Sequence, residues 1–279
     1  MSTASARTFD VIIVGGGPAG LFAAHWLSEH SSLRVLLIEK GKPPLKRHCP
    51  IGDRGCVHCR PCNILCGVGG AGLFSDGKLN FIHKLGKTDL TQFLGLAEAC
   101  QLIDETEAIF NRYGMDGQVF PTDMDAARTI RKEARKHGID LLLIRQKHLG
   151  SDNLPRHIDA MARQIEARGV VFHHSENVRD LLVEDGRVTG VVTDRDTYAA
   201  KSVILAPGRV GAEWMGALAG RHAIGLSQRG IEVGVRVEVH NEIMQDLCEV
   251  IYDPTFFIRT NRYDDQTRTF CTNFGGYVA

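Results

Sequence analysis

Hydrophobic and polar residues follow one another in short blocks at the start of the chain, and each block predicts an element. Apolar runs at residues 11–14 and 35–38 are typical of buried parallel strands. Between them, a glycine-rich turn leads into a helical pattern. Gly15 permits a tight turn out of the first strand, and Gly20 permits close packing of the helix on that strand. The pattern predicts a β-α-β unit over residues 9–40.

The same unit carries residues that suit a dinucleotide. Gly17 leaves no Cβ where a pyrophosphate must approach the backbone, and Pro18 starts a helix whose free amides face that anion. Glu39 ends the second strand, where a carboxylate accepts hydrogen bonds from ribose hydroxyls, which favours FAD or NAD over NADP. The predicted binding residues are Gly15, Gly17, Pro18, Ala19, Gly20, Glu39 and Lys40. The alternative is an ordinary β-α-β unit without a ligand.

The residue pattern in the middle of the chain predicts two helices, followed by further strands of the sheet that the first unit begins. Helical patterns at about residues 89–113 and 123–137 precede a short strand at residues 139–144. The next predicted elements are a helix over residues 154–165, a strand over 170–172, a hairpin over 178–193 around Asp185-Gly186 and a strand over 202–206. These elements complete the sheet that the first unit begins.

Beyond Gly225 the pattern changes. Valines at every second position from Val233 to Val239 predict a half-buried strand of an antiparallel sheet, with Arg236 and Glu238 on its polar face. That polar face lines a substrate pocket or faces solvent. The fold class is therefore α/β: a Rossmann-like nucleotide-binding domain with a β-meander, plus the beginning of an antiparallel α+β second domain.

The expected domain division has four parts. They are a flexible tail at residues 1–8, the nucleotide-binding domain at residues 9–85 and 151–225, a helical insertion at residues 86–150, and the start of a substrate domain at residues 226–279.

Composition narrows the class of protein. The chain has 279 residues, 43% of them hydrophobic, which suffices for one large or two medium domains. A formal net charge of zero gives no support for a nucleic-acid partner. No apolar run is long enough to span a bilayer, and the polar N-terminus lacks the hydrophobic region of a signal peptide. We therefore expect a cytoplasmic protein, whose oligomeric state the sequence leaves open.

Five of the eight cysteines lie close together, at positions 49, 56, 59, 62 and 66. The spacing of Cys56, Cys59, Cys62 and Cys66 is that of a bacterial iron-sulfur cluster, and four thiolates so close also suit zinc. A redox-active thiol pair formed by Cys59 and Cys62 is a third hypothesis. A loop of free thiols without a cofactor is the fourth.

Several segments together resemble a family. They are residues 15–20, Glu39, 56–66, 69–79, 204–208, 234–238 and 268–271. Their combination is similar to the single-dinucleotide-fold flavoproteins of the glutathione-reductase class, and more narrowly to a family of uncharacterised FAD-dependent dehydrogenases. The resemblance implies FAD as the cofactor of the Rossmann-like domain.

The resemblance also implies further FAD-binding residues. A glycine-rich segment is expected to lie over the flavin, and it contains Gly69, Gly70, Ala71, Gly72, Ser75, Asp76, Gly77 and Lys78. In this interpretation Lys78 pairs with a phosphate or stabilises negative charge on the reduced flavin. Val178, Ala206 and Gly208 are expected near the adenosine end.

These inferences predict a FAD-dependent oxidoreductase that transfers a hydride or electrons through the flavin. Its partner is a small-molecule substrate or electron donor, with NAD(P)H as one candidate, and no catalytic acid or base is identified. The alternatives are a nucleotide-binding module without turnover and an RNA-modifying flavoprotein. Flavoproteins of this class carry a late Gly-Asp element that binds the ribityl chain, and none follows Gly208. We therefore expect the chain to be the N-terminal part of a longer protein.

Overall fold

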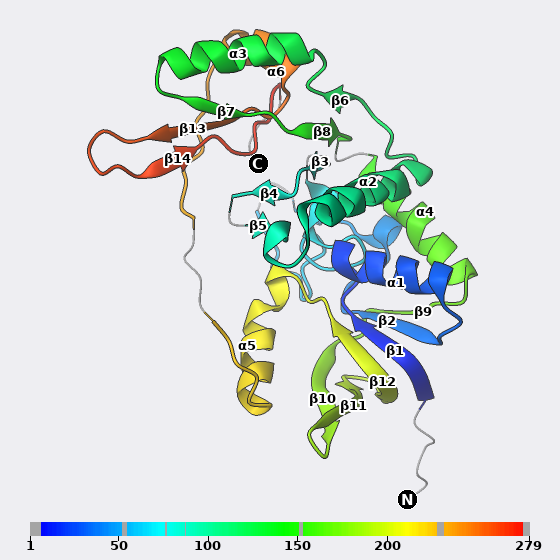
Figure 1. Ribbon diagram of the computed structural model, residues 1–279. Helices are drawn as coiled ribbons and strands as arrows, with labels where there is room; N and C mark the ends of the chain where they lie inside the picture. Colours follow the sequence, from blue (N-terminus) through cyan, green and yellow to red (C-terminus); the bar gives the residue numbers. More distant parts are fainter. Residues whose placement is uncertain are drawn as a thin grey trace, which may run out of the picture. The chain divides into compact units, whose positions relative to one another are not determined.

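The chain divides into two compact units. The computed structural model describes residues 7–51, 55–75, 77–86, 88–150, 153–227 and 232–275 (Figure 1). Unit 1 comprises residues 1–75 and 151–230, and unit 2 comprises residues 76–150 and 231–279. Each unit is built from two stretches that are distant in sequence, so neither folds from one continuous segment.

Unit 1 contains a six-stranded mixed sheet in the order β10-β11-β12-β1-β2-β9. The strands are β1 (Arg7–Val14), β2 (Val35–Glu39), β9 (Val171–His174), β10 (Val178–Glu184), β11 (Arg187–Thr193) and β12 (Thr197–Leu205). Neighbouring strands among β12, β1, β2 and β9 run parallel, whereas β10, β11 and β12 form an antiparallel meander. All five residues of β2 are buried, as expected for the interior of a parallel sheet. The predicted α/β fold, including the hairpin, is confirmed.

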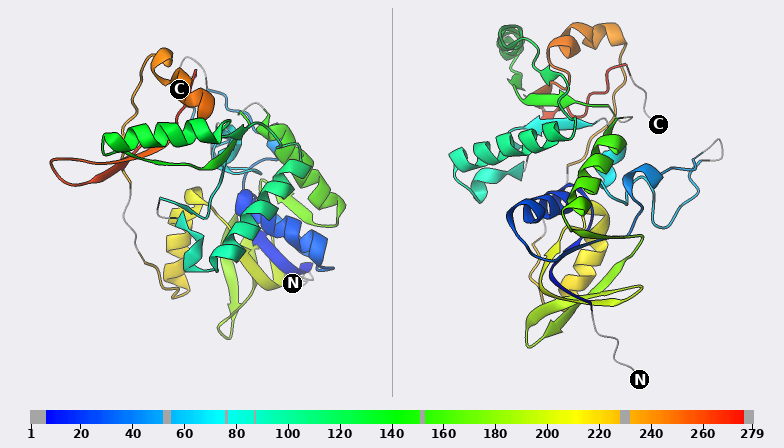
Figure 2. Two further views of the ribbon diagram at one scale, coloured as in Figure 1. Left: turned by 45° about the horizontal axis from the view of Figure 1, so that its top comes forward. Right: turned by 90° about the vertical axis from the view of Figure 1, so that its right-hand side faces the viewer.

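Helices cover both faces of this sheet. They are α1 (Pro18–His30), α4 (Leu154–Ala167) and α5 (Ala212–Arg221), with 3-10 turns η1 (Pro44–Lys46), η2 (Ala71–Phe74) and η4 (Arg209–Gly211). Ile12 and Ile13 are adjacent on β1 and therefore point to opposite faces. Ile12 packs in a core that includes Leu218 of α5, while Ile13 lies beneath Gly20 of α1. Figure 2 shows α1 and α4 together on one side of the sheet.

Unit 2 consists of small antiparallel sheets and three helices. Its sheets have the orders β14-β13-β7, β3-β8-β6 and β4-β5. Their strands are β3 (Lys78–Phe81), β4 (Lys84–Leu85), β5 (Thr88–Asp89), β6 (Val119–Phe120), β7 (Asp140–Leu142), β8 (Arg145–His148), β13 (Thr255–Arg259) and β14 (Gln266–Arg268). The helices are α2 (Leu96–Arg112), α3 (Met124–Lys136) and α6 (Asn241–Val250), and η3 (Leu90–Gln92) is a 3-10 turn. Because β7 pairs with β13, the expected helical insertion and the expected second domain share one sheet. The four-part division itself stays a prediction.

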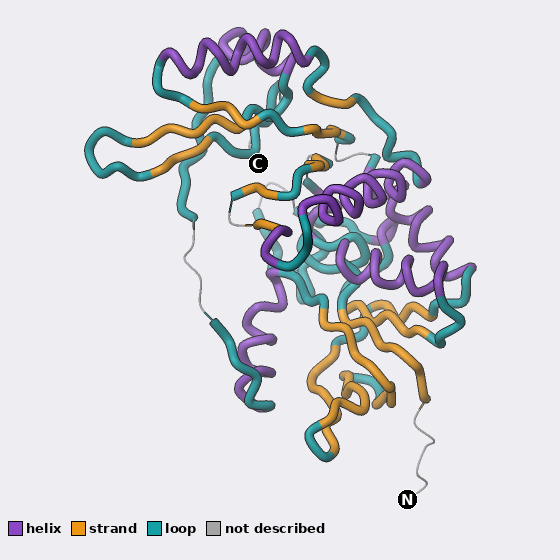
Figure 3. The backbone as a smooth tube through the Cα atoms, in the orientation of Figure 1, coloured by secondary structure: helices purple, strands orange, loops and turns teal. Residues whose placement is uncertain are grey.

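Two predicted elements of unit 2 differ from the structure. Residues 233–239 form no strand: they lie in a loop between α5 and α6 (Figure 3), and Val233 and Val235 are each 88% exposed. The alternation requires a neighbouring strand to bury the valines, and no described residue pairs with this stretch. The helix expected from residue 89 begins instead at Leu96, because Asp89 caps the short η3 turn and accepts the N–H of Thr91 at 3.0 Å.

The helix predicted from residue 123 is confirmed. Asp123 precedes α3 and accepts the N–H groups of Asp125 and Ala126 at 2.8 and 3.0 Å. These bonds satisfy free donors of the first turn, which is why the helix starts here. None of the described helices has the length and apolar character needed to cross a membrane.

The meander of unit 1 should depend on glycine at position 190. A Cβ at Gly190 would lie 2.0 Å from the carbonyl oxygen of Tyr198 on the next strand, so Gly190→Ala should destabilise the protein by roughly 1–3 kcal/mol. Gly216 in α5 has open space around it, so Gly216→Ala is a matched control that should stabilise by about 0.5–1 kcal/mol. Chemical denaturation measures both, and equal effects of the two substitutions would contradict this account of the meander.

Candidate dinucleotide-binding site

The turn between β1 and α1 admits only glycine at two positions. Gly15 has a φ of +107°, and a Cβ there would lie 2.3 Å from the carbonyl oxygen of Ala206. At Gly20 a Cβ would lie 1.9 Å from the carbonyl oxygen of Gly15. The N–H of Ala206 donates to Val14 at 2.8 Å, so the end of β12 lies directly against the turn. The structure thus brings Ala206 to the glycine-rich turn, and its expected place near the adenosine end stays a prediction.

Gly17 has space around it instead. The nearest atom to a Cβ at this position would be Cα of Gly70, 3.9 Å away. Gly17 is the N-cap of α1 and offers no side-chain cap, so the first-turn amides of this helix, including those of Ala19 and Gly20, have no side chain capping them. An uncapped helix start with free space beside it is suited to an anion.

The predicted segment 69–72 lies on the other side of this space. The N–H of Gly69 donates to the carbonyl oxygen of Gly16 at 2.8 Å. Gly70 has a φ of +63°, and a Cβ there would come within 3.2 Å of Cα of Gly17. Two glycine turns, far apart in sequence, are therefore in backbone contact, and a larger residue in the second turn would close the gap between them.

Glu39 is a buried carboxylate with three backbone donors. Only 6% of the residue is exposed. One carboxylate oxygen accepts the N–H of Gly16 at 2.7 Å, and the other accepts those of Gly41 and Gly67 at 2.8 and 2.9 Å. These bonds compensate the cost of burying the charge. Sequence analysis expected only ribose hydroxyls as partners of Glu39, and the structure adds this structural role.

Arg47 binds carbonyl oxygens of the loop whose Gly67 N–H is bound by Glu39. The sequence did not single out Arg47 as a site residue. Its guanidinium donates, over 2.6 to 3.3 Å, to the carbonyl oxygens of Asn63, Ile64, Gly67 and Val68. The guanidinium also lies 4.9 Å from the centre of the Phe74 ring. Burial lowers the pKa of Arg47, and the nearby charge of Glu39 opposes that shift. A basic residue ahead of a glycine-containing loop was the only signal in the sequence.

The described residues of the cysteine loop show no arrangement of metal ligands. All eight cysteines are free thiols. No group of three or more His, Cys, Asp or Glu residues within the described ranges is arranged to hold a metal ion. Cys66 is only 5% exposed, and this burial raises the pKa of its thiol, whereas Cys56 is exposed. The structure therefore gives no support to Cys56, Cys59, Cys62 and Cys66 as a common ligand set.

The remaining predicted residues fall into different parts of the chain. Ser75 is in unit 1 and donates its hydroxyl to Gly72 at 2.7 Å. Val178 is buried at the start of β10, opposite Thr193. Gly208, with a φ of +62°, follows β12. Asp76 lies outside the described residues.

Gly77 and Lys78 belong to unit 2, where Lys78 has a partner that the sequence did not reveal. Its ammonium pairs with the carboxylate of Asp253, and the two side chains are only 9% and 6% exposed. The other oxygen of Asp253 accepts the N–H of Thr272 at 2.7 Å. The charge of Lys78 is thus neutralised within unit 2, so its expected role at a phosphate or at the flavin stays a prediction.

Comparison with known proteins identifies the family of the chain. A family described as "FAD binding domain" matches residues 94–271, which is more than half of the chain. A second family, described as "NAD(P)-binding Rossmann-like domain", matches residues 13–65. The chain belongs to the FAD-binding domain family, and FAD is its cofactor.

Individual relatives are distant. An uncharacterised protein of Clostridium beijerinckii is 22% identical over 84% of this chain, which spans 37% of that relative's length. A D-amino acid dehydrogenase of Rhizobium johnstonii is 44% identical over 18% of this chain and 12% of its own length. Among solved structures, glycine oxidase from Geobacillus kaustophilus has a TM-score of 0.48 and 19% identity, over 79% of this chain and 60% of that one.

The residues present fit FAD. An open glycine position, an uncapped helix start and a second glycine turn surround the place where the pyrophosphate of a dinucleotide binds in such folds. The first-turn amides of α1 would hold the cofactor, while Gly17 and Gly70 would leave the space that it needs.

The ion pair of Lys78 generates a test of that residue's role. Asp253→Ala should destabilise the protein by roughly 3–5 kcal/mol because it leaves a buried ammonium unpaired, whereas Lys78→Met combined with Asp253→Leu should recover most of that loss. Thermal or chemical unfolding measures stability. If the double variant is as stable as the wild type but no longer binds FAD, then Lys78 also serves the cofactor. If it binds FAD normally, the role of Lys78 is structural.

Proposed function

We propose that this chain forms the FAD-binding part of an oxidoreductase, with the pyrophosphate of FAD at the start of α1. The observation that carries the proposal is the free space beside Gly17, bounded by Gly70 and by the uncapped first turn of α1. Membership of the FAD-binding domain family supports it. The bound flavin supplies the hydride or electron transfer, and the protein supplies position and electrostatics.

Different residues of unit 1 bind different parts of the cofactor. The first-turn N–H groups of α1, such as those of Ala19 and Gly20, bind the pyrophosphate, while Gly17 leaves space for it and Pro18, which has no N–H, starts the helix. The turn at Gly69 and Gly70 lies on its other side. Glu39 already accepts three hydrogen bonds, and a carboxylate has about four acceptor positions, so one position remains for a ribose hydroxyl.

Other contacts rest on the resemblance. Lys40, Ala71 and Gly72 lie close in sequence to the residues already described. Val178, Ala206 and Gly208 serve the adenosine end. This assignment corresponds to the glutathione-reductase class of flavoproteins, which the three-stranded meander β10-β11-β12 beside the parallel strands supports.

The substrate is a small molecule, and NAD(P)H is the electron donor that we propose to test. Eight free thiols support a reducing compartment such as the cytoplasm. A nucleotide-binding module without turnover is the second candidate, because no Gly-Asp element is found after Gly208 in this sequence. The balanced charge gives no support to an RNA-modifying enzyme.

The space beside Gly17 provides the direct test. Gly17→Ala meets no atom closer than 3.9 Å in the structure, so the flavin-free protein should keep its thermal midpoint. Its affinity for FAD should fall by about tenfold or more, because the added methyl group occupies the path of the pyrophosphate. Isothermal calorimetry measures the affinity. A Gly17→Ala variant that binds FAD as tightly as the wild type would show that the pyrophosphate lies elsewhere.

A control variant accompanies this measurement. Gly20→Ala should lower the thermal midpoint, since its Cβ would meet a backbone oxygen at 1.9 Å.

The proposed electron donor has a test of its own. Anaerobic mixing of the FAD-loaded protein with NADH or NADPH should bleach the visible flavin absorbance. Persistence of the absorbance rules out the nicotinamide donor, and absence of FAD binding by the wild type rules out the proposal as a whole.

A further inference from the structure

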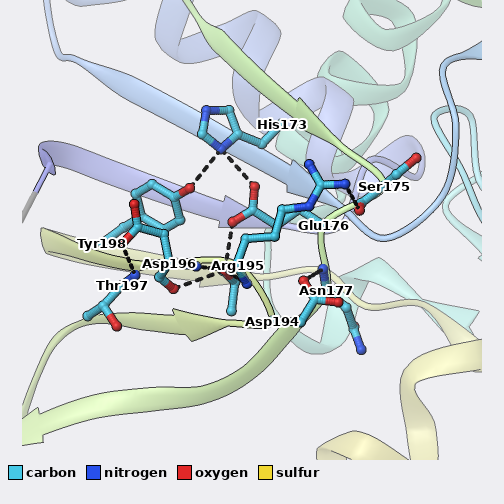
Figure 4. Close-up of polar contacts among 10 residues, drawn as sticks. His173, Ser175, Glu176, Asn177, Asp194, Arg195, Asp196, Thr197 and Tyr198 are labelled. Carbon is cyan, nitrogen blue, oxygen red and sulfur yellow. Dashed lines mark hydrogen bonds and ion pairs between the residues drawn. The ribbon is translucent and has the colours of Figure 1, made fainter.

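A polar network around one buried carboxylate, that of Glu176, lies where β9 ends, beside the residues that follow β2. Figure 4 shows its members, which come from the end of β9, the turn between β11 and β12, and β12 itself. Dinucleotides bind outside the carboxyl ends of parallel strands, and β2 and β9 are parallel neighbours. The network is therefore at the edge of the sheet on which Glu39 lies.

Backbone bonds attach this network to the neighbourhood of Glu39. The N–H of Glu176 donates to the carbonyl oxygen of Glu39 at 3.1 Å, and the N–H of Ser175 donates to that of Gly41 at 2.8 Å. Ser175 has a φ of +53°, a left-handed conformation that a residue with a side chain adopts only when its surroundings hold it there. Arg195 donates to the carbonyl oxygen of Ser175 at 2.6 Å and so helps to hold Ser175 in this conformation.

Glu176 is the centre of the network. The residue is 2% exposed, and each of its carboxylate oxygens has a donor. One oxygen accepts the hydroxyl of Thr193 at 2.6 Å, and the other lies 3.0 Å from Nδ1 of His173. As a carboxylate Glu176 only accepts, so Nδ1 of His173 carries the proton of this contact. The hydroxyl of Tyr198 lies 3.1 Å from the same Nδ1.

Thr193 continues the connection into the meander. Its hydroxyl oxygen accepts the N–H groups of Arg195 and Asp196 at 3.1 and 2.9 Å while its proton faces Glu176. The carboxylate of Glu176 thus joins the end of β9 to the β11–β12 turn, and the backbone N–H of the same residue joins it to Glu39. A shorter side chain at position 176 cannot reach both donors at once.

We propose that Glu176 is a positioning residue for the adenosine half of the FAD site. It holds residues 175–177 against Glu39 and Gly41, and so sets the orientation of the carboxylate that faces the ribose. This role rests on the proposed FAD binding. What matters is the length of the side chain and its two contacts rather than its charge.

Two variants of Glu176 separate length from charge. Glu176→Gln keeps the length. Its amide oxygen can still accept the hydroxyl of Thr193, and its amide nitrogen can donate to Nδ1 of His173 in the other tautomer of the ring. Its affinity for ADP and FAD should stay within about threefold of the wild type. Glu176→Asp keeps the charge but loses the reach, so both affinities should fall together by about tenfold or more.

Asp180→Ala is the control for a general loss of stability in unit 1. Asp180 pairs with His222 and Arg221 at 2.7 and 2.9 Å, and in the part of the chain that the structure describes its carboxylate makes no hydrogen bond to His173, Glu176 or Thr193. This variant should lower the thermal midpoint but leave ADP binding unchanged.

Isothermal calorimetry measures the affinities of every variant for ADP and for FAD, at a temperature below the unfolding transition of each. The proposal is overturned if Glu176→Asp binds ADP as tightly as the wild type, if Glu176→Gln is weaker than Glu176→Asp, or if Asp180→Ala loses as much affinity as Glu176→Asp. A wild type that binds neither ADP nor FAD instead refutes the proposed function, which is a different result.

Discussion

The burial of one carboxylate, that of Glu39, determines the construction of unit 1 around the candidate site. A buried charge is tolerated only when hydrogen bonds replace the lost water, and here all three donors are backbone amides of glycine. Glycine is required at two of them for steric reasons. A Cβ at Gly41 would lie 2.4 Å from the nitrogen of Gly67, and one at Gly67 would lie 2.6 Å from Cδ of Arg47. Through these three hydrogen bonds the carboxylate connects the turn after β1, the end of β2 and the cysteine loop.

This arrangement gives the cysteine loop a structural meaning that does not depend on a metal. Glu39 binds the N–H of Gly67, and Arg47 binds its carbonyl oxygen, so opposite charges hold the two sides of the same peptide segment. The loop then continues into Gly69, whose N–H meets Gly16 in the first turn. A segment rich in thiols thus forms part of the backbone wall of the site. The chemistry of the thiols themselves is a separate question from this role.

Signals that act over a few residues allowed most of unit 1 and one helix of unit 2 to be predicted. The glycine spacing of the first turn, the Asp185-Gly186 hairpin and the cap at Asp123 are local, and each was sufficient to predict its element. Contacts between distant residues were not predictable in this way. Lys78 and Asp253 are 175 positions apart, and Arg47 finds its acceptors only after the loop has folded. The alternation from Val233 to Val239 failed because it reports a preference for a sheet without supplying the neighbouring strand.

The central claim is that FAD binds across the glycine turns of unit 1 that Glu39 organises. Hydrogen exchange of backbone amides, measured by mass spectrometry with and without saturating FAD, tests it most directly. The account predicts slower exchange with FAD in peptides that contain residues 15–20, 39–41 and 67–72. Unchanged exchange in these peptides, or protection confined to unit 2, would contradict it.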